Sequence, residues 1–214
     1  MFGRSELRAL LAMNLAVASA TALVLVNTVV YVRELQGGDD ADVAVTLAVY
    51  GAGSMGVALL TPWLLTVLAD RTLMVIGAVG AATGLAVTAA VFTVTNPDPP
   101  VLMALWATLG AATAMVTTPA GRLLARTGPD RTAVFTAQFS LSHAGFLLTY
   151  PIAGWVGANV DHGLAATILA ILATGAAASA VRITVRGRGQ FVDGQDADRC
   201  DRGAQPGSRE RTGP

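Results

Sequence analysis

Charged residues are missing from long blocks of this 214-residue chain. Asp, Glu, Lys and Arg are absent from residues 43–69, 72–97, 99–121, 132–160 and 162–181. A soluble domain carries about 25% charged residues, whereas this chain has 13% charged and 53% apolar residues. Such blocks are typical of helices in hydrocarbon, because a helix satisfies its backbone polar groups within its own segment. The pattern predicts an all-α polytopic membrane protein.

Six segments are long enough to cross a bilayer, which takes about 20 apolar residues in helical form. We expect six transmembrane helices, at residues 9–32, 43–68, 72–95, 101–120, 132–156 and 163–181. The connections between them are short, so consecutive helices should run antiparallel.

The first segment has an alternative interpretation as a cleaved secretory signal. Arg4 and Arg8 precede it, and Ala18-Ser19-Ala20 resembles a cleavage site. Its apolar run continues to Val32, however, and exceeds the roughly 7 to 15 residues of a signal core. This length favours a retained span.

The basic residues lie mostly on one side of the predicted spans. The chain has no lysine, and every arginine except Arg33 falls on the side that holds both termini. Positively charged flanks stay in the cytoplasm, so we expect a multi-pass protein of the inner (plasma) membrane with both termini cytoplasmic. The composition turns polar after residue 186, which predicts a transmembrane domain at 1–186 and a disordered cytoplasmic tail at 187–214.

Net charge and cysteine content exclude two further classes. The formal net charge is zero, which argues against a nucleic-acid-binding surface. Cys200 is the only cysteine, so neither a disulfide framework nor a thiolate metal cluster is available. We therefore expect no nucleic-acid partner, no metal and no cofactor.

Polar and amphipathic side chains are confined to four of the six predicted spans. Asn, Gln, His, Trp and Tyr occur in the first, second, fourth and fifth spans and are absent from the third and sixth. Polar groups at membrane depth must face protein, a water-filled cavity or the interface. We expect four helices around a polar pathway, with the third and sixth packed outside them. The candidate pathway residues are Asn14, Asn27, Gln138, Ser142, His143 and Tyr150.

The fifth span carries two neighbouring stripes at helical spacing. One stripe contains Gln138, Ser142, Gly145 and Thr149, and the adjacent one contains Phe139, His143, Phe146 and Tyr150. His143 lies about halfway along the span, where an imidazole could bind and release a proton during transport. A neutral histidine that hydrogen-bonds a neighbouring helix remains the alternative.

Small residues and prolines predict where the helices touch and bend. Ala52 with Gly56, and Gly80 with Gly84, have the four-residue spacing of close helix contacts in lipid. Pro62 and Pro151 each remove a backbone hydrogen bond within a span, which favours bending.

Three stretches of the chain carry a resemblance to a known family. They are YVRELQGGDDADVAVTLAVYGAGSMGVALL (31–60), Leu68-Ala69-Asp70-Arg71, and GRLLARTGPDRTAVFTAQFSLSHAGFLLTYPIAGWVG (121–157). In these stretches and in its segment order, the chain resembles the carboxy-terminal six-helix half of a major facilitator superfamily permease. Thr72-Leu73-Met74 stands where the family usually continues with Gly-Arg-Arg, so only the start of that turn motif is present.

The resemblance implies a secondary transporter module that moves a small solute by proton-coupled efflux. Alternating access requires two such halves, so the implied partners are the small-molecule substrate, the lipid bilayer, and either a missing amino-terminal half or a second copy of the chain. A fragment of a longer permease is favoured here, because Met1-Phe2-Gly3-Arg4 resembles the linker before a second half.

Charged residues of the cytoplasmic connections form the candidate gate: Asp70, Arg71, Arg122, Arg126, Asp130 and Arg131. We expect their contacts to break and re-form between inward and outward states. Helix capping is the alternative for Asp70 and Asp130, because each precedes a predicted helix start.

Two other functions are open to such a sequence. Ser54 and His143 could suggest an intramembrane serine protease of rhomboid type, but they lie in the wrong helices for that family, and we expect no enzyme. A non-transporting membrane scaffold or inactive permease fragment would use the same polar stripes only to join helices.

Overall fold

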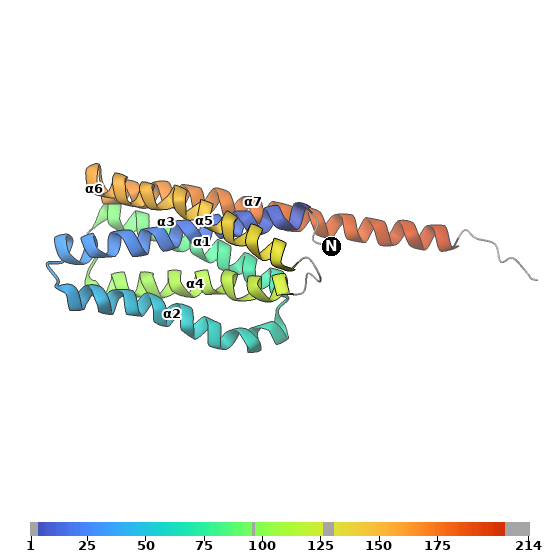
Figure 1. Cartoon of the computed structure of the whole chain (residues 1–214), viewed down its shortest axis with the longest axis horizontal. Helices are drawn as coiled ribbons and strands as arrows, with labels where there is room; N and C mark the ends of the chain where they lie inside the picture. The colour runs from blue at the N-terminus through green and yellow to red at the C-terminus, as the bar shows by residue number, and fades with distance from the viewer. Residues whose placement is uncertain (1–3, 96, 126–130, 204–214) are drawn as a thin grey trace, which may run out of the picture.

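A computed structural model describes residues 4–95, 97–125 and 131–203, which form helices joined by short connections (Figure 1). In chain order these are α1 (Arg4–Val30), the π-helical turn η1 (Tyr31–Leu35), α2 (Asp40–Val67), α3 (Asp70–Val94), α4 (Pro99–Ala125), α5 (Arg131–Pro151), the π-helical turn η3 (Ile152–Val156), α6 (Gly157–Asn159) and α7 (His162–Gly203). The predicted all-helical fold is confirmed for the described residues.

Five helices are long and apolar enough to cross a membrane within the described part of the chain. They cover Arg8–Leu35, Asp40–Val67, Asp70–Val94, Pro99–Leu123 and His162–Val185. These helices are compatible with a multi-pass membrane protein. The fifth expected span, at 132–156, corresponds to α5 and η3, which run along the bundle but are not among these five. Gln138, Ser142 and His143 lower the mean hydropathy of α5 and account for this difference.

The connection between α1 and α2 shows how local sequence fixes a helix start. Gly37 has φ of 68°, a conformation that glycine adopts without steric cost. Asp39 then caps α2, because its carboxylate accepts from the amides of Ala41 and Asp42 at 2.8 and 3.0 Å. The Asp42 side chain accepts in return from the Asp39 amide at 3.0 Å, which completes a capping box.

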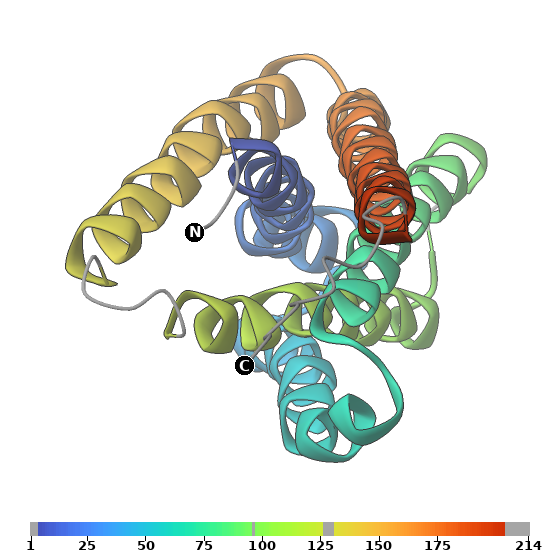
Figure 2. The ribbon, with the colours of Figure 1, turned by 90° about the vertical axis from the view of Figure 1, so that its right-hand side faces the viewer.

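Helix α1 occupies the middle of the bundle (Figure 2). It packs against α7, α5, α4 and α3, and its alanines at 16, 18, 20 and 22 are fully buried. Helix α4 packs against α2 and α3, and α3 packs against α7. A cleaved first segment would therefore remove the helix that most of the others contact.

Helix α2 packs mainly against α4 and α5 mainly against α1, while α3 and α7 lie side by side on another side of the bundle (Figure 2). The contact faces of α3 and α7 carry small residues, since Gly77 and Gly84 of α3 lie directly against α4, and Ala173 and Ala177 of α7 are buried. Their other faces are exposed at Val87 and Ile171, so the expectation that the third and sixth spans pack outside a four-helix pathway stays a prediction.

Helix α7 continues well beyond the apolar span that ends at Val185 and projects from the bundle (Figure 1). Residues 187–203 are therefore helical, whereas the sequence predicts a disordered tail from residue 187. A helix already nucleated by packing extends at little further cost, which is a physical reason for the difference. The rest of the expected tail, from residue 204, lies outside the described residues.

The two prolines named in the sequence have different effects on their helices. Helix α2 continues through Pro62 to Val67. Pro151 ends α5, and the chain then forms the π-helical turn η3. The backbone irregularity that was expected at Pro151 is therefore present as a π turn.

Backbones of α2 and α4 approach most closely at two glycines. A Cβ on Gly53 would lie 2.2 Å from the Ala107 carbonyl oxygen, and one on Gly110 would lie 2.1 Å from the Tyr50 carbonyl oxygen. The predicted contact at Gly80 and Gly84 is also present, against Ala112 and Leu109. The predicted contact at Ala52 and Gly56 is wrong, because both residues are exposed and a Cβ on Gly56 would meet nothing within 4 Å.

These contacts predict opposite effects for two similar substitutions. Gly110→Ala should destabilise the bundle by about 1–3 kcal/mol, because its methyl group would force the α2 and α4 backbones apart. Gly56→Ala is the matched control and should be neutral or slightly stabilising, because alanine favours helix more than glycine does. Unfolding in mixed micelles at increasing dodecyl sulfate measures both. Equal stability of the two variants would contradict the packing described here.

Candidate functional site

A chain of hydroxyl groups joins three helices in the middle of the bundle. The hydroxyl of Tyr50 on α2 lies 3.2 Å from that of Thr21 on α1 and 3.3 Å from that of Thr113 on α4. Thr113 also donates to the Gly110 carbonyl at 2.9 Å, directly at the close approach of α2 and α4. This hydroxyl chain links the first, second and fourth spans, and Tyr50 is its centre.

The first stripe of α5 is the face that packs against α1. Thr149 is fully buried, and its hydroxyl lies 3.2 Å from the Ala18 carbonyl and 3.1 Å from the Gly145 carbonyl. A Cβ on Gly145 would lie 3.4 Å from the Ala18 side chain. Gln138 is buried on the same stripe, and its Oε1 has no partner among the described residues. This stripe combines helix packing with one unsatisfied polar group.

The second stripe of α5 is a row of neighbouring rings that are tilted toward one another, of which Phe139, His143 and Tyr150 are exposed. The ring centroids of Phe139 and His143 lie 4.0 Å apart, and those of Phe146 and Tyr150 lie 5.3 Å apart. His143 is exposed, and its Nδ1 lies 2.9 Å from the Phe139 carbonyl oxygen on its own helix. The structure therefore places His143 and Tyr150 on the surface of this chain, not inside it.

The other candidate pathway residues, Asn14, Ser142 and Asn27, lie at different depths of the bundle. Asn14 donates to the Leu10 carbonyl at 3.0 Å, and Ser142 donates to the Phe139 carbonyl at 2.9 Å, both on their own helices. Asn27 is 2% exposed and lies near the opposite end of α1 from Asn14. The six candidates are thus not gathered around one point in this chain.

A second group of polar and aromatic side chains surrounds the junction of α1 and η1. Tyr31 is 1% exposed and stacks on Phe92 of α3, with centroids 4.1 Å apart. The rings of Trp106 on α4 and His162 on α7 lie 6.0 and 5.7 Å from that of Tyr31. Trp106 is fully buried and donates from Nε1 to the Thr28 hydroxyl at 2.7 Å. We call Asn27, Tyr31 and His162 the Tyr31 cluster.

Sequence reasoning missed most of this group for identifiable reasons. His162 lies one residue before the expected start of the sixth span, so it was not counted among polar residues at membrane depth. Tyr31 lies at the end of the first span, where an aromatic residue is usually an interfacial anchor. The recurrence of Asn27 and Tyr31 at four-residue spacing, which puts both on one helical face, could have drawn attention to the pair.

The described candidate gate residues lie at the end of the bundle that holds the N-terminus (Figure 1). Asp70 and Arg71 begin α3, Arg122 is exposed in the last turn of α4, and Arg131 is the first residue of α5. Arg126 and Asp130 lie outside the described residues. The gate itself stays a prediction.

The capping alternative for Asp70 differs from the structure by one residue. The N-cap of α3 is Ala69, so Asp70 lies inside the first turn and does not occupy the cap. Its negative charge still lies where the helix dipole favours an anion.

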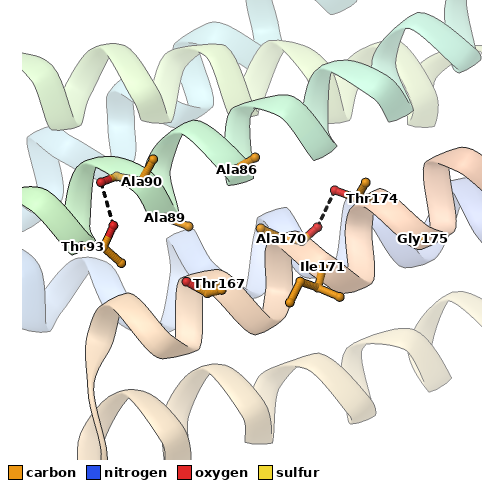
Figure 3. A pocket seen from close by; sticks show the side chains of 9 residues that line it. All are labelled: Ala86, Ala89, Ala90, Thr93, Thr167, Ala170, Ile171, Thr174 and Gly175. Carbon is orange, nitrogen blue, oxygen red and sulfur yellow. Dashed lines mark hydrogen bonds between the residues drawn. The ribbon is translucent and has the colours of Figure 1, made fainter.

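Shallow grooves follow the seam between α3 and α7. One has a volume of about 590 Å³ and contains Thr93 of α3 with Thr167 and Thr174 of α7 (Figure 3). All three hydroxyls donate to carbonyls of their own helices, at 2.9, 2.7 and 2.7 Å. The remaining lining is alanine, glycine and Ile171, so this groove suits an acyl chain better than a polar solute.

Comparisons of the chain with protein-family models, with curated proteins and with solved structures found no match. The resemblance to major facilitator permeases therefore rests on the sequence motifs.

The hydroxyl chain gives a test of polar coupling between spans. Tyr50→Phe keeps the ring but removes both contacts to Thr21 and Thr113, and should lower stability by about 0.5–1.5 kcal/mol. Tyr150→Phe is the control, because Tyr150 lies on the exposed stripe of α5 and should tolerate the change. Thermal unfolding in detergent, followed by circular dichroism, measures both variants. A larger loss in Tyr150→Phe would contradict the assignment.

Proposed function

We propose that this chain is a membrane transport module equivalent to one half of a major facilitator superfamily transporter, which moves a small solute outward by proton-coupled efflux. The observation that carries the proposal is the pattern of helix contacts. The chain divides into two three-helix units, α1–α2–α3 and α4–α5–α7, and the principal contacts of each unit are made with the other. Because most helix contacts run between the two units, the units form one bundle.

The contact pattern is preserved when the two units are exchanged. If α1 takes the place of α4, α2 that of α5 and α3 that of α7, then the α1–α5 contact becomes α4–α2 and the α1–α7 contact becomes α4–α3. The contacts α1–α4 and α3–α7 map onto themselves. Equivalent helices such as α1 and α4 run antiparallel, which is the arrangement of inverted repeats in secondary transporters.

The hydroxyl chain lies where such repeats place their polar site. Substrate sites in transporters of this kind form at the interface between repeats, near the middle of the membrane. Thr21 belongs to one unit and Thr113 to the other, and Tyr50 joins them. Asn14, Gln138 and His143 are the further polar groups of the proposed pathway.

The chemistry of the described helices favours an uncharged solute. The charge-free blocks provide no counter-ion at membrane depth for an ionic substrate. The cytoplasmic side would hold both termini together with Asp70, Arg71 and Arg122, in agreement with the distribution of arginine. A second six-helix unit, either another copy of the chain or a preceding half, would complete the pathway.

Transport can be tested in proteoliposomes that contain the purified chain and an imposed proton gradient. Small neutral fluorescent solutes should move against their gradient only when the proton gradient is present, and His143→Gln should abolish that pH dependence. Solute fluorescence inside the vesicles is the measurement. Movement that is independent of the proton gradient would contradict proton coupling, and no movement in a folded sample would favour the non-transporting scaffold.

The side on which a second unit packs can be tested by photo-crosslinking. A benzophenone amino acid at Leu147, which is 77% exposed on α5, should capture a protein partner, because α5 flanks the proposed pathway. The same group at Ile171, which is 66% exposed on the α3–α7 seam, should capture lipid. Mass analysis in membranes distinguishes a second copy, another protein and lipid. Equal protein capture at the two positions would contradict this placement.

A further inference from the structure

The Tyr31 cluster contains three polar atoms that have no hydrogen-bond partner among the described residues. They are Asn27 Nδ2, the Tyr31 hydroxyl and His162 Nε2. Asn27 and Tyr31 are 2% and 1% exposed, so bulk water does not satisfy them. Nearly all buried polar groups in proteins have a partner in the protein or in an ordered water molecule. Three unpaired polar atoms, one each on Asn27, Tyr31 and His162, therefore indicate a site that binds a polar molecule or ion.

Several parts of the chain surround these residues. Asn27 lies on α1 and Tyr31 is the first residue of η1, four positions later, a spacing that puts both on about the same side of the helix. His162 begins α7, and the rings of Phe92 and Trp106 enclose Tyr31 from α3 and α4. A Cβ on Gly157 would lie 2.7 Å from Asn27 Oδ1, so the absence of a side chain there allows the amide its position.

The backbone around the cluster is irregular on both sides. The π-helical turn η1 begins at Tyr31, and η3 ends next to Gly157. Single π turns within helical segments are frequent at functional sites, because they redirect side chains that a regular helix would point elsewhere. The irregular backbone therefore supports the interpretation drawn from the unpaired atoms.

The three atoms have complementary roles toward water and a proton. Asn27 Nδ2 donates only, and a tyrosine hydroxyl both donates and accepts. A neutral imidazole with its hydrogen on Nδ1 presents Nε2 as an acceptor, and the same nitrogen becomes a donor once protonated. A buried water molecule makes two to four hydrogen bonds. One water could thus join all three groups.

We propose that the Tyr31 cluster is a buried proton-binding site, in which water joins Asn27, Tyr31 and His162 and the His162 imidazole takes up the proton. A hydronium ion from the adjacent aqueous phase transfers its proton to Nε2, leaving a water molecule and an imidazolium. Asp161, which precedes His162 and interacts electrostatically with Tyr31, is one charged neighbour of the cluster, and Arg33 and Glu34 of η1 and Asp98 before α4 lie at the same end of the bundle. The neighbours from α3 and α4, Phe92 and Trp106, are uncharged. Only the coupling of this proton to solute movement rests on the proposed transport function.

Histidine titration can test the site directly, because the chain has only two histidines. The full chain, labelled with ¹⁵N-histidine in lipid nanodiscs, gives one NMR titration for each imidazole, and His143→Gln assigns them. Tyr31→Phe keeps the stacking on Phe92 but removes the hydroxyl that would accept, through water, from the imidazolium. The titration midpoint of His162 should fall by about 0.5 to 1 pH unit, the equivalent of one hydrogen bond. The midpoint of His143 should not change.

Two further variants make the test decisive. Asn27→Leu removes the amide that holds the water and should lower the His162 midpoint as well, so it replaces Tyr31→Phe if that variant does not fold. Tyr150→Phe, on the exposed stripe of α5, should leave the His162 titration midpoint unchanged. A His162 midpoint that stays constant or rises in both cluster variants would overturn the proposal. Because neither substrate nor partner is present, this result is independent of the transport and crosslinking outcomes.

Discussion

Direct contact between helix backbones is the constraint on which the bundle depends. Lipid tails are as apolar as leucine, so helices in a membrane gain little from burying apolar surface and must associate through close packing and hydrogen bonds. Gly53 and Gly110 let α2 and α4 touch through their main chains, and buried alanines do the same along α1. The polar contacts at Tyr50 and Thr149 are possible only because the helices already lie this close.

The interlocking of the two three-helix units follows from that packing. Each unit is covered mainly by helices of the other, so neither has a contact surface of its own that could persist separately. Helix α1 is the element shared most widely, and it carries residues of both the hydroxyl chain and the Tyr31 cluster. A displacement of α1 would therefore change the contacts of both the hydroxyl chain and the Tyr31 cluster, although the two lie at different depths of the bundle.

The sequence predicts the helices well because a charge-free block of about 20 residues has few other stable structures in hydrocarbon. The two stripes of α5 were also predicted, since helical spacing alone determines which residues share a face. Spacing could not predict which stripe faces the bundle and which faces outward, because the exposure of His143 and the burial of Gln138 depend on where α1 lies. Spacing likewise could not distinguish Gly56 from Gly53, since which small residue meets a neighbour depends on the rotation of the helix. His162 was overlooked because a boundary error of one residue removed it from consideration.

The position of α2 has a consequence for the order in which the bundle comes apart. This helix is held mainly by α4, whereas α1 is held by helices on several sides. Detaching α2 breaks essentially one interface, and the same holds for α5, which contacts mainly α1. The amides of these two flanking helices should therefore have lower protection against exchange with deuterium than those of α1. The element nearest the start of the chain is thus the last to open, and its sequence neighbour is among the first.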